Sequence, residues 1–361
     1  MISCQTSADS ILNGCAGEKM KFSVIMPVYN CEDTLSISIE SLIHQTFPDW
    51  ELLLVDDGST DGSLSFCRSY SRKDPRIRVV HQENAGQGTA RNKGIALAAG
   101  DYLVFCDSDD YYEKNALEKL AKAAENYADP DLIVGGYREF RFSKDSSVEY
   151  LRKVAGAESY LNHPDDIYHA YMPLIQKGLI TSPWAKAYRR ELIIGQHVRF
   201  PDLRRCQDVV FNLENYDHLH SLCIVSDTLY NYQTPGGDVY TRKFPVDMFD
   251  IDKSVYRQKL DRLKKWRVDD EASVRYCNSS YLKDISVLLR LNFQNQWRLD
   301  RKKRRELSRR MLHDPDTINA CATVPDGIMN KIIRQVVKSQ SMTIVSLFSL
   351  ATLFYQRLFS R

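Results

Sequence analysis

Three carboxylates, Asp107, Asp109 and Asp110, fall within four positions directly after an apolar run. The run, 103–106, has the length and composition of a buried strand, so the carboxylates stand where that strand leaves the core. Carboxylates this close repel one another unless a cation or a shared proton relieves them. Mg²⁺ is often held by one or two carboxylates together with substrate phosphates. The cluster therefore predicts either a metal site that receives a phosphorylated substrate or a solvated turn rich in Asp.

Two other predicted strands also end in polar or aromatic residues. Pro27 and Tyr29 close the strand predicted over 21–28. Asp57 follows the strand predicted over 51–55. Ligands of parallel sheets bind at the carboxyl ends of the strands, so these side chains should converge on one edge. This convergence favours the metal-and-phosphate interpretation over the solvated turn.

The elements that would position these residues alternate between strand and helix with short connections. Helical spacing of apolar residues predicts helices at about 32–45, 63–72, 89–99 and 114–126. Short apolar runs predict the intervening strands, which also include 77–80 and 132–136. This alternation predicts an α/β fold with a mostly parallel sheet flanked by helices. The alternation weakens from about 138 to 240, and from about 245 onward the pattern is helical.

Charge and cysteine usage limit the protein classes. The 361-residue chain has a net charge of only +2, which gives no indication of a nucleic-acid partner. Residues 253–310 are nevertheless basic, with 18 Lys and Arg against 7 Asp and Glu. Nine scattered cysteines without a CxxC motif indicate thiols in a reducing compartment. Residues 1–19 lack the features of a signal peptide, so we expect a cytoplasmic protein whose first 19 residues are a disordered extension or precede the true start.

Four segments, in this order and spacing, carry a resemblance to a known family. They are 24–30 (VIMPVYN), 55–61 (VDDGSTD), Gly86 with 90–94 (ARNKG), and 107–110 (DSDD). Together they resemble family 2 glycosyltransferases, strongly over 21–140 and more loosely over 180–235. The resemblance implies a GT-A fold, a nucleotide-sugar donor and usually an inverting reaction. A bacterial surface polysaccharide or glycolipid pathway is the context that it suggests.

The resemblance also implies roles for donor-side residues. Pro27 and Tyr29 would line the pocket of the nucleotide base. Asp57 would accept a hydrogen bond from the base, typically uracil. Arg91 would reach the nucleotide or its phosphates, although pairing with a neighbouring carboxylate is its alternative.

The DxD motif of the family corresponds to Asp107, Ser108 and Asp109. Asp109 would bind Mn²⁺ or Mg²⁺, and Asp107 would help to hold the ribose or the donor sugar. Asp110 is expected to support the turn or to cap a helix rather than to contact the metal. A divalent ion would neutralise the charge that develops on the departing nucleoside diphosphate.

An inverting displacement needs a general base for the acceptor hydroxyl. The family places an acidic residue well downstream, and Asp208 matches it. The residue before it is Gln207, where relatives often carry Glu, so any role that needs a charge there is in doubt. Trp184 is a candidate platform for the acceptor sugar, and core packing is its alternative.

The C-terminal part is not covered by the resemblance. Over 342–359 the apolar residues share one helical stripe, which predicts an amphipathic tail next to the basic region. The uncharged run is too short for a confident transmembrane helix. It suggests contact with the inner face of the cell membrane, and a core helix or an oligomer contact are the alternatives.

These inferences predict a metal-dependent glycosyltransferase that moves a sugar from a nucleotide-sugar, with UDP as the expected nucleotide, to a hydroxyl of a glycan or lipid-linked acceptor. The alternative is a catalytically degenerate protein that binds sugar nucleotides. The predicted organisation is a GT-A domain over 20–240 and a basic helical region over 241–361. Within the domain, 20–137 would bind the nucleotide-sugar and 138–240 would supply the base and the acceptor surface.

Overall fold

The computed structural model describes residues 22–142, 148–234, 247–292 and 300–323, together with 335, 336 and 339. The predicted extension 1–19 and the predicted amphipathic tail 342–359 lie outside these residues. The strands are β1 (Phe22–Val28), β2 (Trp50–Asp57), β3 (Ile77–Gln82), β4 (Tyr102–Phe105), β5 (Tyr111–Tyr112), β6 (Leu132–Phe142), β7 (Val148–Val154), β8 (Ser159–Leu161), β9 (Lys186–Arg189) and β10 (Leu222–Thr234).

One sheet contains all of these strands, in the order β3-β2-β1-β4-β9-β6-β10-β5, with β7 on β6 and β8 on β10. Its first four strands are parallel, with Phe22 of β1 level with Trp50 of β2 and Tyr102 of β4. The strands β1, β2 and β4 are buried along their whole length, which explains their nearly continuous apolar sequences. The carboxyl ends of these strands therefore meet at one edge, as the sequence predicted.

The second half of the sheet is mixed. The short strand β9 runs antiparallel to both β4 and β6 and so joins the two halves. The strand β10 pairs with β6 in parallel and with β5 in an antiparallel sense. The strand predicted at 132–136 continues to Phe142 as one strand, β6.

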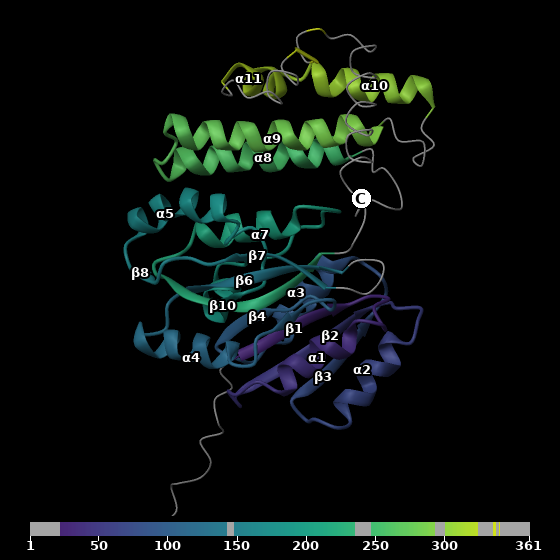
Figure 1. Cartoon of the computed structure of the whole chain (residues 1–361), viewed down its shortest axis with the longest axis vertical. Helices are drawn as coiled ribbons and strands as arrows, with labels where there is room; N and C mark the ends of the chain where they lie inside the picture. The colour runs from purple at the N-terminus through teal and green to yellow at the C-terminus, as the bar shows by residue number, and fades with distance from the viewer. Residues whose placement is uncertain are drawn as a thin grey trace, which may run out of the picture.

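Helices cover the sheet and continue beyond it (Figure 1). They are α1 (Leu35–Ile43), α2 (Ser63–Ser71), α3 (Gln87–Leu97), α4 (Ala116–Asn126), α5 (Pro164–Lys177), α6 (Arg190–Gly195), α7 (Gln207–Tyr216), α8 (Met248–Lys265), α9 (Glu271–Asn292), α10 (Arg301–Leu312) and α11 (Pro315–Thr323). The helices α8 and α9 form a layer beyond α5 and α7, and α10 and α11 lie on its far side (Figure 1). The predicted α/β fold class with C-terminal helices is confirmed.

One close approach positions a site residue. Gly94 of α3 faces Ile25 of β1, and a Cβ at Gly94 would lie 2.4 Å from Cγ2 of Ile25. Glycine therefore lets α3 lie directly on the sheet. Because Arg91 is one turn away on the same helix, this packing fixes the depth at which its guanidinium enters the site.

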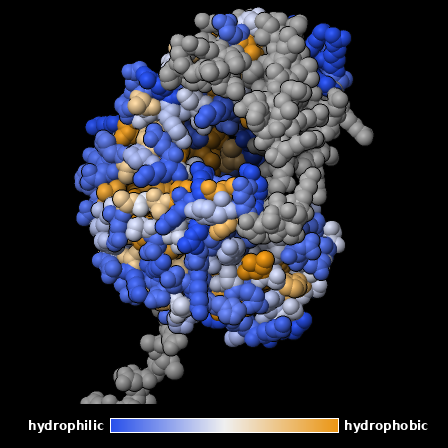
Figure 2. All heavy atoms as spheres, viewed as in Figure 1, coloured by the Kyte–Doolittle hydropathy of each residue, from blue (hydrophilic) through white to orange (hydrophobic). Residues whose placement is uncertain are grey.

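The surface shows no membrane-spanning element in the part of the chain that the structure describes. None of the helices there is both long enough and apolar enough to cross a bilayer. On the face shown in Figure 2, hydrophilic residues cover most of the surface, and apolar residues gather in a hollow beside the C-terminal helices.

Candidate active site

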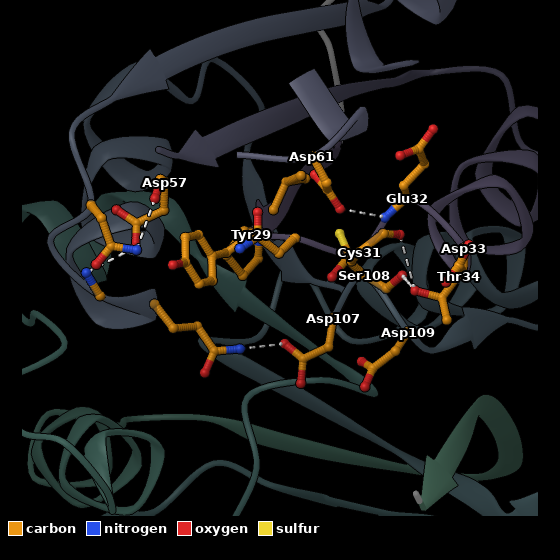
Figure 3. Close-up of a pocket in the computed structure, with 16 residues that line it drawn as sticks. Tyr29, Cys31, Glu32, Asp33, Thr34, Asp57, Asp61, Asp107, Ser108 and Asp109 are labelled. Carbon is orange, nitrogen blue, oxygen red and sulfur yellow. Dashed lines mark hydrogen bonds between the residues drawn. The ribbon is translucent and has the colours of Figure 1, made fainter. Parts of the chain in front are cut away.

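A cavity of about 670 Å³ opens at the carboxyl edge of β1, β2 and β4 (Figure 3). Residues from the predicted donor site line it: Pro27, Tyr29, Asp57, Asp107, Ser108 and Asp109. In Figure 3 Asp107 and Asp109 lie on one wall, and Asp57 lies across the cavity beyond the ring of Tyr29. The structure thus brings together residues that are 80 positions apart in the chain.

Asp57 is buried and hydrogen-bonded within the protein, whereas Tyr29 is exposed. The carboxylate of Asp57 is buried and accepts hydrogen bonds from the backbone of Ala85 (2.9 Å) and Gly86 (2.8 Å) and from Nε2 of Gln82 (2.8 Å). Asp57 therefore shapes the Gly-rich loop before α3, a task that the sequence did not reveal. The ring of Tyr29 is 48% exposed and is available to a planar ligand.

The DxD turn is held from two sides. Oδ1 of Asp107 accepts hydrogen bonds from Arg91 (2.7 Å) and from Gln87 (3.3 Å). The backbone N–H of Asp107 donates to the hydroxyl of Tyr230 on β10 (3.0 Å), and that hydroxyl donates to Asp110 (2.9 Å). Asp110 is buried and also accepts from the backbone of Gln233, so it supports the turn as expected.

Asp109 is the carboxylate that is left open to the cavity. Partial desolvation, and then the neighbouring charge of Asp107, raise its pKa above the ordinary value. A nearby cation would stabilise the ionised form of such a carboxylate. Among the described residues there is no group of three or more Asp, Glu, His or Cys side chains arranged to hold a metal ion. Any divalent ion here would need further oxygens from water or from a substrate, and a diphosphate supplies them.

The charge of the whole cavity is one-sided. Six of its sixteen lining residues are acidic, and none is Lys, Arg or His: Glu32, Asp33, Asp57, Asp61, Asp107 and Asp109. An anionic ligand cannot enter such a cavity favourably without a counter-ion, because like charges in a partly desolvated site repel strongly. The residues therefore suit a cation together with an anion better than an anion alone.

Arg91 lies behind the cavity rather than in its lining. Its guanidinium, 1% exposed, donates to Oδ1 of Asp107 and to Oδ1 of Asp208, both at 2.7 Å. The expectation that it reaches the nucleotide is not what this geometry describes, because two of its nitrogens are held by carboxylates. Arg91 joins the DxD turn to the predicted base Asp208, which lies 117 positions after Arg91 in the chain.

Asp208 stands in the first turn of α7, and its side chain is 34% exposed. Burial raises its pKa and the Asp107 charge adds to the shift, whereas Arg91 and Lys186 oppose it. Since Arg91 binds Oδ1, Oδ2 is the oxygen left for another partner. A carboxylate with a raised pKa and one open oxygen fits the role of a general base.

Lys186, on β9, is the second buried cationic side chain near Asp208. Its Nζ donates to the backbone oxygens of Ser182 (2.7 Å) and Trp184 (3.1 Å). Burial lowers the pKa of Lys186 to about 7, and Asp208 opposes that shift. The amine ties down the loop that leads into β9.

Trp184 is 6% exposed and packs among aromatic rings. It stacks on Tyr230 (4.9 Å between centroids) and Tyr232 (5.3 Å), and it meets Tyr137 edge-on (4.7 Å). Of the two roles considered for Trp184, core packing is the one that this geometry supports. A sugar platform would need a ring face open to solvent.

Comparison with known proteins adds the family. Residues 23–194 match the family described as Glycosyl transferase family 2. The chain is 30% identical to the putative glycosyltransferase EpsH of Bacillus subtilis over 258 residues, which cover 68% of this chain and 71% of that protein. It is 34% identical to the uncharacterized glycosyltransferase EpsJ of the same organism over 215 residues, which cover 58% of this chain and only 60% of EpsJ.

The chain belongs to glycosyltransferase family 2. The fold agrees: a crystal structure of S. aureus TarS, residues 1–349, superposes with a TM-score of 0.60 at 20% identity and covers 93% of this chain and 92% of that one. The same fragment in complex with UDP-GlcNAc gives a TM-score of 0.57 at 21% identity. The GT-A-type fold and the glycosyltransferase class that the sequence predicted are confirmed.

Within this glycosyltransferase, Tyr230 is a site residue that sequence reasoning missed. It lies in a strand whose aromatic residues look like ordinary core, and its partners are more than 100 positions away. Lys186 left a weak signal, because a lone Lys between apolar strand residues is unusual. The side chain of Gln207 makes no hydrogen bond to Asp208: its amide donates to the backbone of Leu203, and its Oε1 is buried beside Gly88 without a hydrogen-bond partner among the described residues.

Proposed function

We propose that this glycosyltransferase moves a sugar from a UDP-sugar to a hydroxyl of a glycan or lipid-linked acceptor, with a divalent cation and with inversion, in the synthesis of a bacterial surface polymer. The observation that carries the proposal is the Arg91 bridge. Arg91 binds both Asp107, which lines the proposed donor cavity, and Asp208, so the proposed general base and the donor site belong to one active site.

Donor binding would use the cavity from end to end. The exposed ring of Tyr29 offers a face to a nucleotide base, and Pro27 adjoins it. Oδ2 of Asp57 accepts one backbone hydrogen bond and has a further lone pair for a base N–H. The UDP and UDP-GlcNAc complexes of TarS, a protein of the same fold, support the choice of uridine.

The acidic lining is the reason to propose a metal. Mn²⁺ or Mg²⁺ held by Asp109 and the donor diphosphate would offset the repulsion between six carboxylates and the phosphates. When bound, the ion would stabilise the charge that develops on the leaving nucleoside diphosphate. Asp107, which Arg91 and Gln87 keep in place, would face the ribose or the donor sugar.

The acceptor step would depend on Asp208. Its free Oδ2 takes the proton from the acceptor hydroxyl as the oxygen attacks the anomeric carbon. The bond from that carbon to the diphosphate breaks on the opposite face, so a single displacement inverts the configuration. Arg91 holds Oδ1 during this step and stabilises the ionised carboxylate.

We propose contact with the inner membrane face through the C-terminal tail, because the amphipathic stripe over 342–359 follows a basic region. Deleting 341–361 should then move the protein from the membrane pellet to the supernatant after cell fractionation. Unchanged partitioning would exclude the tail as the anchor.

The test of the function is a panel of nucleotide-sugars with and without Mn²⁺. Thermal shift would report binding, and release of UDP would report turnover. We expect stabilisation by one or more UDP-sugars only when Mn²⁺ is present. Binding without any turnover on supplied acceptors, in both the parent and Asp208→Asn, would favour the degenerate sugar-nucleotide-binding protein instead.

A further inference from the structure

The helix that carries Asp208 is held at both ends by one C-terminal helix. Before α7, Nε of Arg205 lies 3.2 Å from Oδ1 of Asp252 on α8. After α7, the carboxylate of Asp217 accepts hydrogen bonds from Nε of Arg262 (3.1 Å), near the other end of α8, and from Nε1 of Trp266 (2.9 Å), the residue that follows α8. The two ends of α8 therefore contact the residues on both sides of α7.

Apolar contacts fill the space between these two ends. Val210 of α7 packs with Ile251 and Val255 of α8 in a small cluster of its own, separate from the main core. Cys206 and Leu203, from the loop before α7, pack against the same cluster. The loop that leads to Asp208 thus depends on α8 for its packing as well as for its ion pair.

The Arg205–Asp252 pair is built into the interior. The side chain of Asp252 is 1% exposed, and its Oδ2 is buried without a hydrogen-bond partner among the described residues. Burial raises the pKa of Asp252 to about 7, with Arg205 opposing the shift and Asp284 of α9 adding to it. Arg205 stabilises the ionised carboxylate of Asp252, so removal of either side chain should displace the loop before α7.

The backbone of that loop is also strained. Cys206, the residue before α7, has a φ of 59°, in the left-handed region that side chains other than glycine seldom adopt. Such a conformation persists when its surroundings determine it. Asp208 is only two positions further along the chain.

We infer that Asp252, acting through Arg205, is a positioning residue for the general base, so that α8 helps to hold the base in place. The inference rests on the proposed role of Asp208. Arg91 fixes the carboxylate from the donor side, and α8 fixes the backbone of the same residue from the opposite side. The donor cavity is lined by residues of β1, β2, the loops after β1 to β4 and the start of α3, and none of its lining residues belongs to α7 or α8.

The experiment compares Asp252→Asn, Arg205→Gln and the double variant by steady-state kinetics in the full chain. Each single change should lower kcat about tenfold, since small displacements of a catalytic group cost about this much or more. The KM for the donor and the Kd for UDP should stay within about twofold of the parent. The double variant should be no worse than either single one, because the two residues act as a unit. Arg205→Lys, which keeps the charge, should retain most of kcat.

A matched control lies one residue along on α8. Lys253 forms an ion pair with the buried Asp314, the residue before α11, and Figure 1 shows α11 on the side of the α8–α9 layer away from α7. Asp314→Asn should lower the Tm about as much as Asp252→Asn but leave kcat unchanged. Equal effects of the two variants on kcat, or an unchanged kcat in Asp252→Asn, would reduce Asp252 to a structural role.

Asp208→Asn, assayed in parallel, separates the two proposals. Loss of transfer in Asp208→Asn with full kcat in Asp252→Asn would overturn this inference alone. Retention of transfer in Asp208→Asn would overturn the proposed base and the inference together.

Discussion

The donor cavity and the cluster around Asp208 handle negative charge in opposite ways. The cavity is lined by six carboxylates without a cationic side chain among its sixteen lining residues. Behind it, Asp107 and Asp208 share the buried guanidinium of Arg91, and Lys186 lies nearby. Except at Asp107, which belongs to both regions, the charge of the cavity is left for a ligand to neutralise, whereas Arg91 and Lys186 offset the charge of the second region. Donor binding should therefore depend on added cations, and the geometry of the base should not.

The largest expected effect is that of Asp109→Ala on the donor side. Removing the open carboxylate of the DxD turn should lower Mn²⁺-supported turnover by about 10³-fold or more, because metal-type stabilisation of a leaving group is worth several kcal/mol. UDP binding measured by calorimetry should lose its dependence on Mn²⁺. Asp33→Asn, another acidic residue of the same cavity, is the matched control and should change turnover little. Near-parent activity of Asp109→Ala would refute the metal assignment.

Asp208→Asn tests the other side of the comparison. The amide keeps the shape of the side chain but cannot take a proton, so kcat should fall about 10²- to 10⁴-fold. UDP and Mn²⁺ binding should stay at the parent level, since the donor cavity is unchanged. An equal loss of UDP binding would show that the two regions are not independent and that Asp208 is structural.

Arg91→Gln should produce an intermediate effect with a distinctive pH dependence. Arg91 lowers the pKa of Asp208, which burial has already raised. Removing the guanidinium raises that pKa further, so the acid limb of the kcat profile should move to higher pH. At neutral pH we expect a loss of about 10- to 100-fold, of the size of a misplaced catalytic group.

The control for this prediction is Arg91→Lys, which keeps a positive charge and should leave the acid limb closer to that of the parent. Measuring UDP affinity in Arg91→Gln also decides between the two roles considered for the residue. Weakened UDP binding with an unshifted pH profile would restore the nucleotide contact that the sequence suggested.

The sequence predicted the donor half better than the base half for physical reasons. Continuous apolar runs and helical spacing identify β1, β2, β4 and α3, and parallel strands necessarily bring their carboxyl ends together. The pairing of Arg91 with Asp208 depends on β9, a four-residue strand that inserts antiparallel between β4 and β6. No local pattern encodes such an insertion, so the two residues were found separately but not as a pair.

Side-chain burial was the second limit. Trp184 and Arg91 have residue types that suit ligand contacts, and spacing alone cannot show that one is stacked among tyrosines and the other is held by two carboxylates. The hydroxyl of Tyr230 connects Asp107 to Asp110 from a strand that reads as plain core. Burial and long-range partners come from the whole fold rather than from a motif.

The smallest expected effect concerns Trp184, which packs against Tyr137, Tyr230 and Tyr232. Trp184→Phe should lower the free energy of unfolding by about 1–3 kcal/mol, because the smaller ring buries less apolar area and stacks less on its aromatic neighbours. Because the ring is 6% exposed, the KM for the acceptor should hardly change. Chemical denaturation and acceptor titration measure the two quantities on the same sample. A stable Trp184→Phe variant with a tenfold higher acceptor KM would instead make Trp184 a sugar-binding residue and extend the acceptor site into what now looks like core.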